Sequence, residues 1–324
     1  MNNASQADRK SQELVCLLLG FLVFFASLVL SGFYTQADQA AYHIAYSILP
    51  GMGWEAGQLA YQSRISGAEG MHYLVSLVGS TLDIDKDLLM SACNGILAAY
   101  SMRLFVTWGA DIRIAAAIVA TNFYVLVLYF AAERLKFGFL FLVLALLSTG
   151  RPIRMFVFSF MSVWSHFSML LVCLGAWFSD FFAKARRGEL PARTIWLKFA
   201  LPAALIAAGL AFKSSYLLWK LNTYLAGRES FHVTSLVPVL ILLGLSCFYA
   251  KRLVGPVLSF LPVMIGIAVL GGSRLNMLGY FIFLYYGLRA NGGLNAGVLA
   301  TLAYLAYKSF GLVSNIIVHG HGFP

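Results

Sequence analysis

Apolar runs of about 20 residues recur along this chain, and they constrain its fold more than any other feature. The first run, LVCLLLGFLVFFASLVLSGF, is apolar on every face and long enough to cross a bilayer as a helix. Membrane-spanning β-strands alternate polar and apolar residues, and these runs do not. Because 60% of the residues are hydrophobic and only 11% are charged, the sequence predicts an all-α, polytopic transmembrane helical bundle.

The distribution of lysine and arginine predicts how the helices cross the membrane. Loops rich in these residues stay in the cytoplasm, and a cytoplasmic N-terminus gathers 14 of the 23 basic residues on that side. The resulting topology has about 11 spans and an outer C-terminus. The spans are expected at approximately 13–31, 88–107, 114–130, 135–149, 153–165, 167–180, 194–212, 233–249, 253–271, 274–290 and 294–312. The short pair within 153–180 keeps the basic loop 184–198 inside.

The longest segment between predicted spans, residues 32–87, lies on the outer face in this topology. Its apolar residues are interleaved with polar ones, which favours one or two interfacial or re-entrant helices. A full span at 71–82 is the alternative, although about 12 residues is short for a span. No internal repeat is visible, so residues 1–324 are predicted to form a single integral membrane domain. The four cysteines lie in apolar runs and are expected to act as small hydrophobes.

The predicted topology brings charged residues from distant segments to the outer face. Glu133, Arg134 and Lys136 lie between two apolar runs, where charges usually face a cavity or a partner. We expect the three to form the rim of an outward-facing cavity, with Glu133 holding Arg134 in place. Simple pairing of Arg134 with Glu133, or snorkelling to the interface, is the alternative. Arginine suits phosphate recognition, and a carboxylate nearby can serve as general base on a sugar hydroxyl. Together these are the groups needed to transfer a glycosyl unit from a lipid phosphate.

Four segments carry a resemblance to a known family. In order along the chain they are QADQAAYHIAY with Asp38 and Tyr42, ERLKFGFLFLVLALL with Arg134, WSHFSMLL with His166, and GSRLNMLGYFIFLYY with Arg274 and Tyr280. They resemble the landmarks of EpsG-type and Wzy-type bacterial polysaccharide polymerases. The chain departs from the family pattern at three positions. Gln39 is at a position where the family usually has tyrosine, Leu135 where it has glutamine, and Ser165 where it has phenylalanine.

This resemblance implies a glycosyltransferase with a GT-C-like fold in the bacterial inner (plasma) membrane. Such an enzyme joins undecaprenyl-pyrophosphate-linked glycans into an O-antigen, capsule or exopolysaccharide on the outer face. The implied catalytic residues are Asp38 and His166. The implied substrate-binding residues are Glu133, Arg134, Lys136, Arg274, Tyr42 and Arg228. No cofactor, metal or nucleic acid is expected; the lipid bilayer is a partner, and whether a chain-length regulator binds is open.

Several alternatives remain open at the level of sequence. A GT-C transferase that adds one sugar from a polyprenyl phosphate is the nearest rival, and a lipid-linked oligosaccharide flippase or an O-acyltransferase is a more distant one. A structural, hydrogen-bonded role is the alternative for His166. The acidic run Asp83, Asp85 and Asp87 is expected to be solvated rather than to bind metal. The histidines of the VHGHGFP tail are expected to be disordered or loosely packed.

Overall fold

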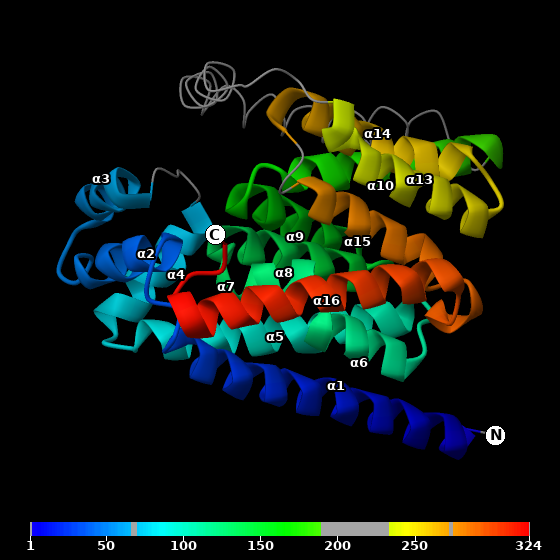
Figure 1. Cartoon of the computed structure of the whole chain (residues 1–324). Coiled ribbons are helices and arrows are strands. Elements are labelled where there is room, and N and C mark those ends of the chain that lie inside the picture. The colour runs from blue at the N-terminus through cyan, green and yellow to red at the C-terminus, as the bar shows by residue number, and fades with distance from the viewer. Residues whose placement is uncertain (1, 66–69, 189–232, 272–274, 324) are drawn as a thin grey trace. The chain divides into compact units, whose positions relative to one another are not determined.

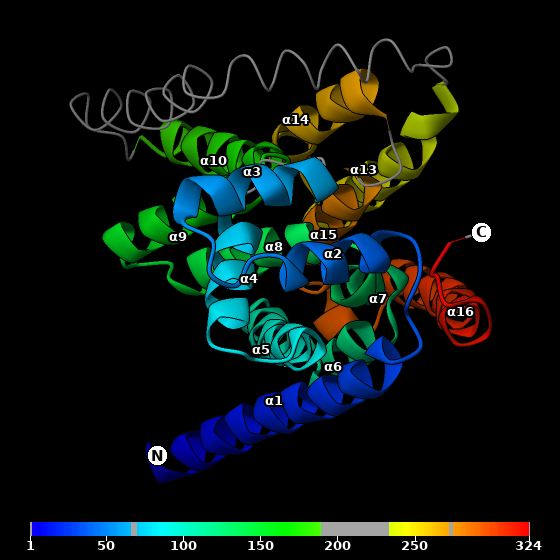
Figure 2. The ribbon, with the colours of Figure 1, turned by 90° about the vertical axis from the view of Figure 1, so that its left-hand side faces the viewer.

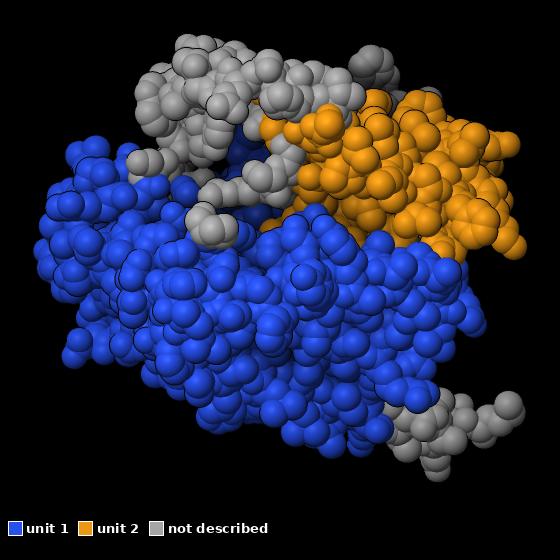
Figure 3. All heavy atoms as spheres, viewed as in Figure 1, with its two compact units in different colours: residues 1–170, 287–324 blue, residues 171–286 orange. Residues whose placement is uncertain are grey.

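The computed structural model describes residues 2–65, 70–188, 233–271 and 275–323. All regular structure in these ranges is helical (Figure 1), which confirms the all-α class predicted from the sequence. The chain divides into two compact units, residues 1–170 with 287–324 and residues 171–286 (Figure 3). The predicted span at 194–212 lies outside the described residues.

Among the described residues, three helical stretches are long and apolar enough to cross a membrane. They are Lys10–Ser31 within α1 (Asn2–Ser31), Lys86–Thr107, which is α5, and Asn291–His319, which contains η2 (Asn291–Gly293) and α16 (Ala296–His319). The bent pair formed by α6 (Ile112–Thr121) and α7 (Phe123–Phe130) raises the number to four if it forms one broken span. A helical membrane protein is therefore indicated, and the full set of 11 spans stays a prediction.

The span predicted at 114–130 is broken at Asn122, where α6 and α7 meet at an angle of 50°. Asn122 is extended rather than helical, and its side chain accepts a hydrogen bond from the backbone N–H of Tyr124 at 3.0 Å. Asparagine is a preferred N-cap, so it begins α7 anew. Ser309 of α16 donates to the carbonyl of Thr121 at 2.7 Å. This bond satisfies a backbone group at the break, which a broken membrane span would require.

Residues 32–87 contain three short helices rather than one or two, followed by the start of α5. They are α2 (Asp38–Ser47), α3 (Trp54–Ile65) and α4 (Gly70–Thr81), which are grouped in Figure 2. At about 1.5 Å per residue, α4 is roughly 18 Å long, too short for a bilayer core of about 30 Å. The alternative of a full span at 71–82 is therefore disfavoured.

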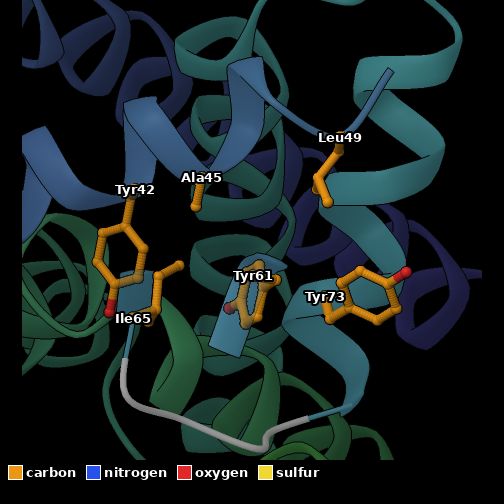
Figure 4. Packing of buried hydrophobic residues seen from close by; sticks show 6 residues of the cluster. All are labelled: Tyr42, Ala45, Leu49, Tyr61, Ile65 and Tyr73. Carbon is orange, nitrogen blue, oxygen red and sulfur yellow. The ribbon is translucent and has the colours of Figure 1, made fainter. Parts of the chain in front are cut away.

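An aromatic core holds these three helices together (Figure 4). It comprises Tyr42, Ala45, Leu49, Tyr61, Ile65 and Tyr73, all buried. The hydroxyl of Tyr73 donates to the carbonyl of Trp54 at 2.7 Å, which ties α4 to the start of α3. Burying several aromatic rings supplies the stabilisation that helices this short cannot provide by themselves.

Close backbone contacts position the longer helices of the first unit. In the crossing of α1 and α5, a Cβ atom added at Gly95 would lie 2.7 Å from the carbonyl oxygen of Gly20. In the pair formed by α8 (Glu133–Leu147) and α9 (Pro152–Ser165), Ser162 donates to the carbonyl of Gly138 at 2.7 Å. Small residues and interhelical hydroxyl bonds are typical of helix packing in membranes.

The helix α10 (Met169–Arg186) follows α9 after a break at His166, so the two short helices predicted within 153–180 are present as helices. The second unit also contains η1 (Val233–Leu236), α13 (Val237–Ala250), α14 (Val254–Leu270) and most of α15 (Leu275–Gly287). There the hydroxyl groups of Ser259 and Tyr286 lie 2.9 Å apart and link α14 to α15.

The histidine-containing tail is ordered, contrary to the expectation of a disordered or loosely packed end. Helix α16 continues to His319, and the backbone N–H of Gln36 donates to the carbonyl of Gly320 at 2.9 Å. The rings of His319 and His321 stack, with their centroids 5.8 Å apart. This backbone bond joins the tail to the loop that leads from α1 into α2.

Candidate functional site

The carboxylate of Glu133, the first residue of α8, is buried in a network that joins five helices. Its Oε1 accepts hydrogen bonds from Gln39 Nε2 at 2.8 Å and from Lys86 Nζ at 3.1 Å. Its Oε2 lies 3.1 Å from Nε2 of His72. The amide of Gln39 also donates to the carbonyl of Phe130 at 2.6 Å and accepts from Lys86 at 2.8 Å. A buried carboxylate needs such partners, since an isolated charge is costly out of water.

His72 extends this network into α3. Because a carboxylate only accepts hydrogen bonds, His72 donates from Nε2, and its Nδ1 accepts from the hydroxyl of Tyr61 at 2.6 Å. Burial lowers the pKa of His72 below its ordinary value, and the hydrogen bond to Glu133 opposes this shift. The ring is therefore neutral at pH 7. We call Gln39, Tyr61, His72, Lys86 and Glu133 the Glu133 cluster.

Next to the Glu133 cluster, Arg134 and Tyr42 form a contact between two predicted substrate-binding residues. Nε of the half-buried Arg134 donates to the hydroxyl of Tyr42 at 3.2 Å. Burial raises the pKa of Tyr42 to about 12, and the Arg134 guanidinium opposes that increase. We expected Glu133 to hold Arg134 in place. The contacts of the Glu133 carboxylate instead go to the Glu133 cluster, and the Tyr42 hydroxyl contacts Arg134.

Asp38 begins α2, one turn before Tyr42, and its side chain is exposed. A carboxylate in the first turn of a helix is favoured by the helix dipole. Its charge is close enough to contribute to the raised pKa of Tyr42. The proposed base is therefore near the Tyr42–Arg134 contact and open to solvent, whereas the carboxylate of Glu133 is buried.

Lys136 was expected at the rim of a cavity, and the structure instead buries its side chain completely. Its Nζ has no hydrogen-bond partner among the described residues. Helix geometry explains the difference: three positions after Glu133, Lys136 shares the inward face of α8 with that residue. A direct contact between Lys136 and a substrate is therefore not favoured by its position.

His166 terminates α9 and lies against α8. Its Nδ1 is 2.7 Å from the hydroxyl of Ser168 and accepts a hydrogen bond from the Ser168 backbone N–H at 3.3 Å. A Cβ atom added at Gly138 would lie 3.3 Å from the Cβ of His166, so the glycine permits this close approach. These contacts agree with a structural, hydrogen-bonded role for His166. Its catalytic role stays a prediction.

A small cavity of about 20 Å³ borders the Glu133 cluster. Its wall includes Gln39, Glu133 and Asp87, together with Asn94 of α5, whose buried Oδ1 has no partner among the described residues. Ligand pockets measure roughly 300–1,000 Å³. The cavity is therefore far too small for a sugar or a pyrophosphate.

Two predicted substrate-binding arginines, Arg228 and Arg274, lie outside the described residues.

In the acidic run, Asp85 caps α5 by accepting from the backbone N–H of Leu88 at 2.8 Å. Asp87 lies 3.3 Å from Nε2 of His43 and 3.5 Å from Nζ of Lys86. Two of the three acidic residues thus have structural partners, and the described part of the chain contains no cluster of side chains suited to hold a metal ion.

Four members of the Glu133 cluster were missed from the sequence: Gln39, Tyr61, His72 and Lys86. A signal existed for Lys86, since a lysine at the start of an apolar helix needs a partner or solvent. For Gln39, Tyr61 and His72, the residue type alone does not indicate burial beside Glu133.

Comparison with known proteins adds nothing to this picture, since no protein-family model, curated protein or solved structure matches the chain.

Proposed function

We propose that this membrane protein is a glycosyltransferase of the polysaccharide polymerase type. It joins undecaprenyl-pyrophosphate-linked oligosaccharide repeat units on the outer face of the bacterial inner membrane. The observation that carries the proposal is the 3.2 Å hydrogen bond from Arg134 to Tyr42. It joins two of the four segments that resemble such polymerases, although 92 residues separate them in the chain.

The chemistry assigned to these residues follows from their types and positions. Asp38, exposed at the start of α2, removes the proton from the acceptor hydroxyl as that oxygen attacks the anomeric carbon. The bond from this carbon to the pyrophosphate oxygen breaks, and undecaprenyl pyrophosphate leaves. Arg134 binds the departing pyrophosphate with its guanidinium group. Arg228, Arg274 and His166 remain candidate substrate contacts. Glu133 and Lys136 are buried, so they support the site without contacting the substrate.

The test is the ladder of lipid-linked glycans from cells that express each variant at a matched level. A guanidinium binds two oxygens at once and an ammonium does not, so Arg134→Lys should be nearly as damaging as Arg134→Ala. We expect both to lose polymer and to accumulate single repeat units. Arg113→Lys is the control, because the Arg113 side chain is 88% exposed and faces Asp111.

Asp38→Asn keeps the shape of the side chain and removes its charge. Polymer should fall by about 10²-fold or more if Asp38 is the base. Normal ladders from Asp38→Asn and from both Arg134 variants would overturn the proposal. Accumulation of incomplete repeat units would instead favour the transferase that adds a single sugar.

A further inference from the structure

Gln39 uses its whole side-chain amide within the Glu133 cluster. Its Nε2 donates to the Phe130 carbonyl at 2.6 Å and to Glu133 Oε1 at 2.8 Å, and its Oε1 accepts from Lys86 at 2.8 Å. An amide offers two donor hydrogens, and both have acceptors here. One side chain of α2 is thereby bonded to the end of α7, to the start of α8 and to the start of α5.

These bonds join the inward face of α2 to its neighbours. The buried residues of α2 are Gln39, Tyr42 and Ala45, spaced three apart. Of these, Gln39 has polar partners on both α5 and α8, and Tyr42 has Arg134 on α8. A helix of 10 residues has little stability by itself. A rotation by one residue position, about 100°, would break all three amide bonds and remove the Tyr42 hydroxyl from Arg134.

We infer that Gln39 is a positioning residue that holds Tyr42 against Arg134 by fixing the orientation of α2 on the Glu133 carboxylate and Lys86. The inference deepens the proposed function and rests on it, because the pair so positioned is the proposed pyrophosphate site. Gln39 is also one of the positions at which the chain departs from the resembling motif, which usually has tyrosine beside the aspartate. Gln39 itself is 5% exposed and does not reach a substrate.

The chemistry of the contacts makes glutamine specific at this position. Glutamate would lose both donors and would place a second carboxylate 2.8 Å from Glu133. Methionine has a similar length but forms none of the three bonds. The double variant Gln39→Glu with Glu133→Gln again has one amide and one carboxylate. The carboxylate at position 39 accepts from Lys86 and from the amide at position 133, whose oxygen accepts from His72 Nε2. The bond from Lys86 to position 133 and the bond to the Phe130 carbonyl are lost.

The test is hydrogen–deuterium exchange of the purified full-length protein in detergent, read at the amides of Asp38–Ser47. We expect exchange there to rise about tenfold or more in Gln39→Glu and Gln39→Met. It should stay unchanged in the control Gln36→Glu, whose side chain is exposed one turn earlier. The double variant with Glu133→Gln should be better protected in α2 and make more polymer than Gln39→Glu alone, because it removes the repulsion between two carboxylates and regains the bond between positions 39 and 133. Gln39→Met supplies the test if Gln39→Glu fails to fold.

The outcomes separate this inference from the proposed function. Unchanged hydrogen exchange in α2 of the Gln39 variants, or a folded double variant no better protected than Gln39→Glu, would overturn the positioning role. If exchange responds as expected but the ladders of Gln39→Met and Arg134→Lys are normal, the positioning geometry stands and the proposed function fails. Raised hydrogen exchange and lost polymer in the Gln39 variants, with recovery of both in the double variant, would support the positioning role and the proposed function.

Discussion

Lys86 and Glu133 form a buried ion pair, and its removal should have a large and asymmetric effect on stability. Their charged atoms lie 3.1 Å apart, and the two side chains are 4% and 3% exposed. Removing one partner of such a pair leaves an uncompensated buried charge, which costs about 3–5 kcal/mol. Lys86→Met should reach this range. Glu133→Gln should fall near its lower end, because Asp87 remains 3.5 Å from Nζ of Lys86.

The double variant Lys86→Met with Glu133→Gln tests whether the cost arises from charge. With both charges gone, the amide introduced at position 133 can bond to Gln39 and His72. The double variant should therefore lose less than the sum of the two single variants, by about 2 kcal/mol. Unfolding of the purified protein in detergent, followed by tryptophan fluorescence, measures each free energy of unfolding.

An exposed pair on α10 provides the matched control. Nζ of Lys184 lies 2.5 Å from a carboxylate oxygen of Asp180, and the two side chains are 34% and 57% exposed. Lys184→Met should cost no more than about 0.5 kcal/mol, since exposed pairs one helical turn apart contribute little. Additive effects of Lys86→Met and Glu133→Gln, or single costs as small as that of Lys184→Met, would refute the buried-pair reasoning.

Three further predictions follow from other parts of the molecule. Gly95→Ala should lower the free energy of unfolding by about 1–3 kcal/mol, because the added Cβ meets the α1 backbone; Gly311→Ala, in open space on α16, should be neutral or raise it by up to about 1 kcal/mol. Burial raises the pKa of Tyr42 from 10 to about 12, so stability should fall as pH rises through this window, and Tyr42→Phe should reduce the fall in unfolding measurements. Reporter fusions after Asp38 should report an outer location and fusions after Arg113 a cytoplasmic one; the reverse result would refute the topology.

The helical fold could be predicted because hydropathy decides which segments leave water. The break at Asn122 was missed, although asparagine inside an apolar run is an N-cap signal. The length of the apolar run around Asn122 favoured one continuous span in the prediction. The three short helices of residues 32–87 were hard to count, since their stability comes from shared aromatic packing rather than from a pattern within each helix.

The site was predictable only in part, for a related reason. The resemblance named Tyr42 and Arg134 as substrate-binding residues without predicting a contact between them, and the structure brings the two together. The partners of Glu133 come from 47, 61 and 94 positions away in the chain. Hydropathy does not specify which face of a short helix turns inward, so Gln39 and His72 could not be assigned and Lys136 was placed at a rim. Only the packed helices determine these neighbours.

The most direct test of the central claim is the set of lipid-linked glycans that accumulates in source cells from which this chain has been deleted. The account predicts complete single repeat units on undecaprenyl pyrophosphate, accessible from the outer face of the inner membrane, with no longer polymer. Re-expression of the intact chain should restore the ladder, and the Arg134→Ala variant should not. A normal ladder after deletion, or repeat units that accumulate incomplete or on the cytoplasmic face, would contradict the assignment of this chain as the polymerase.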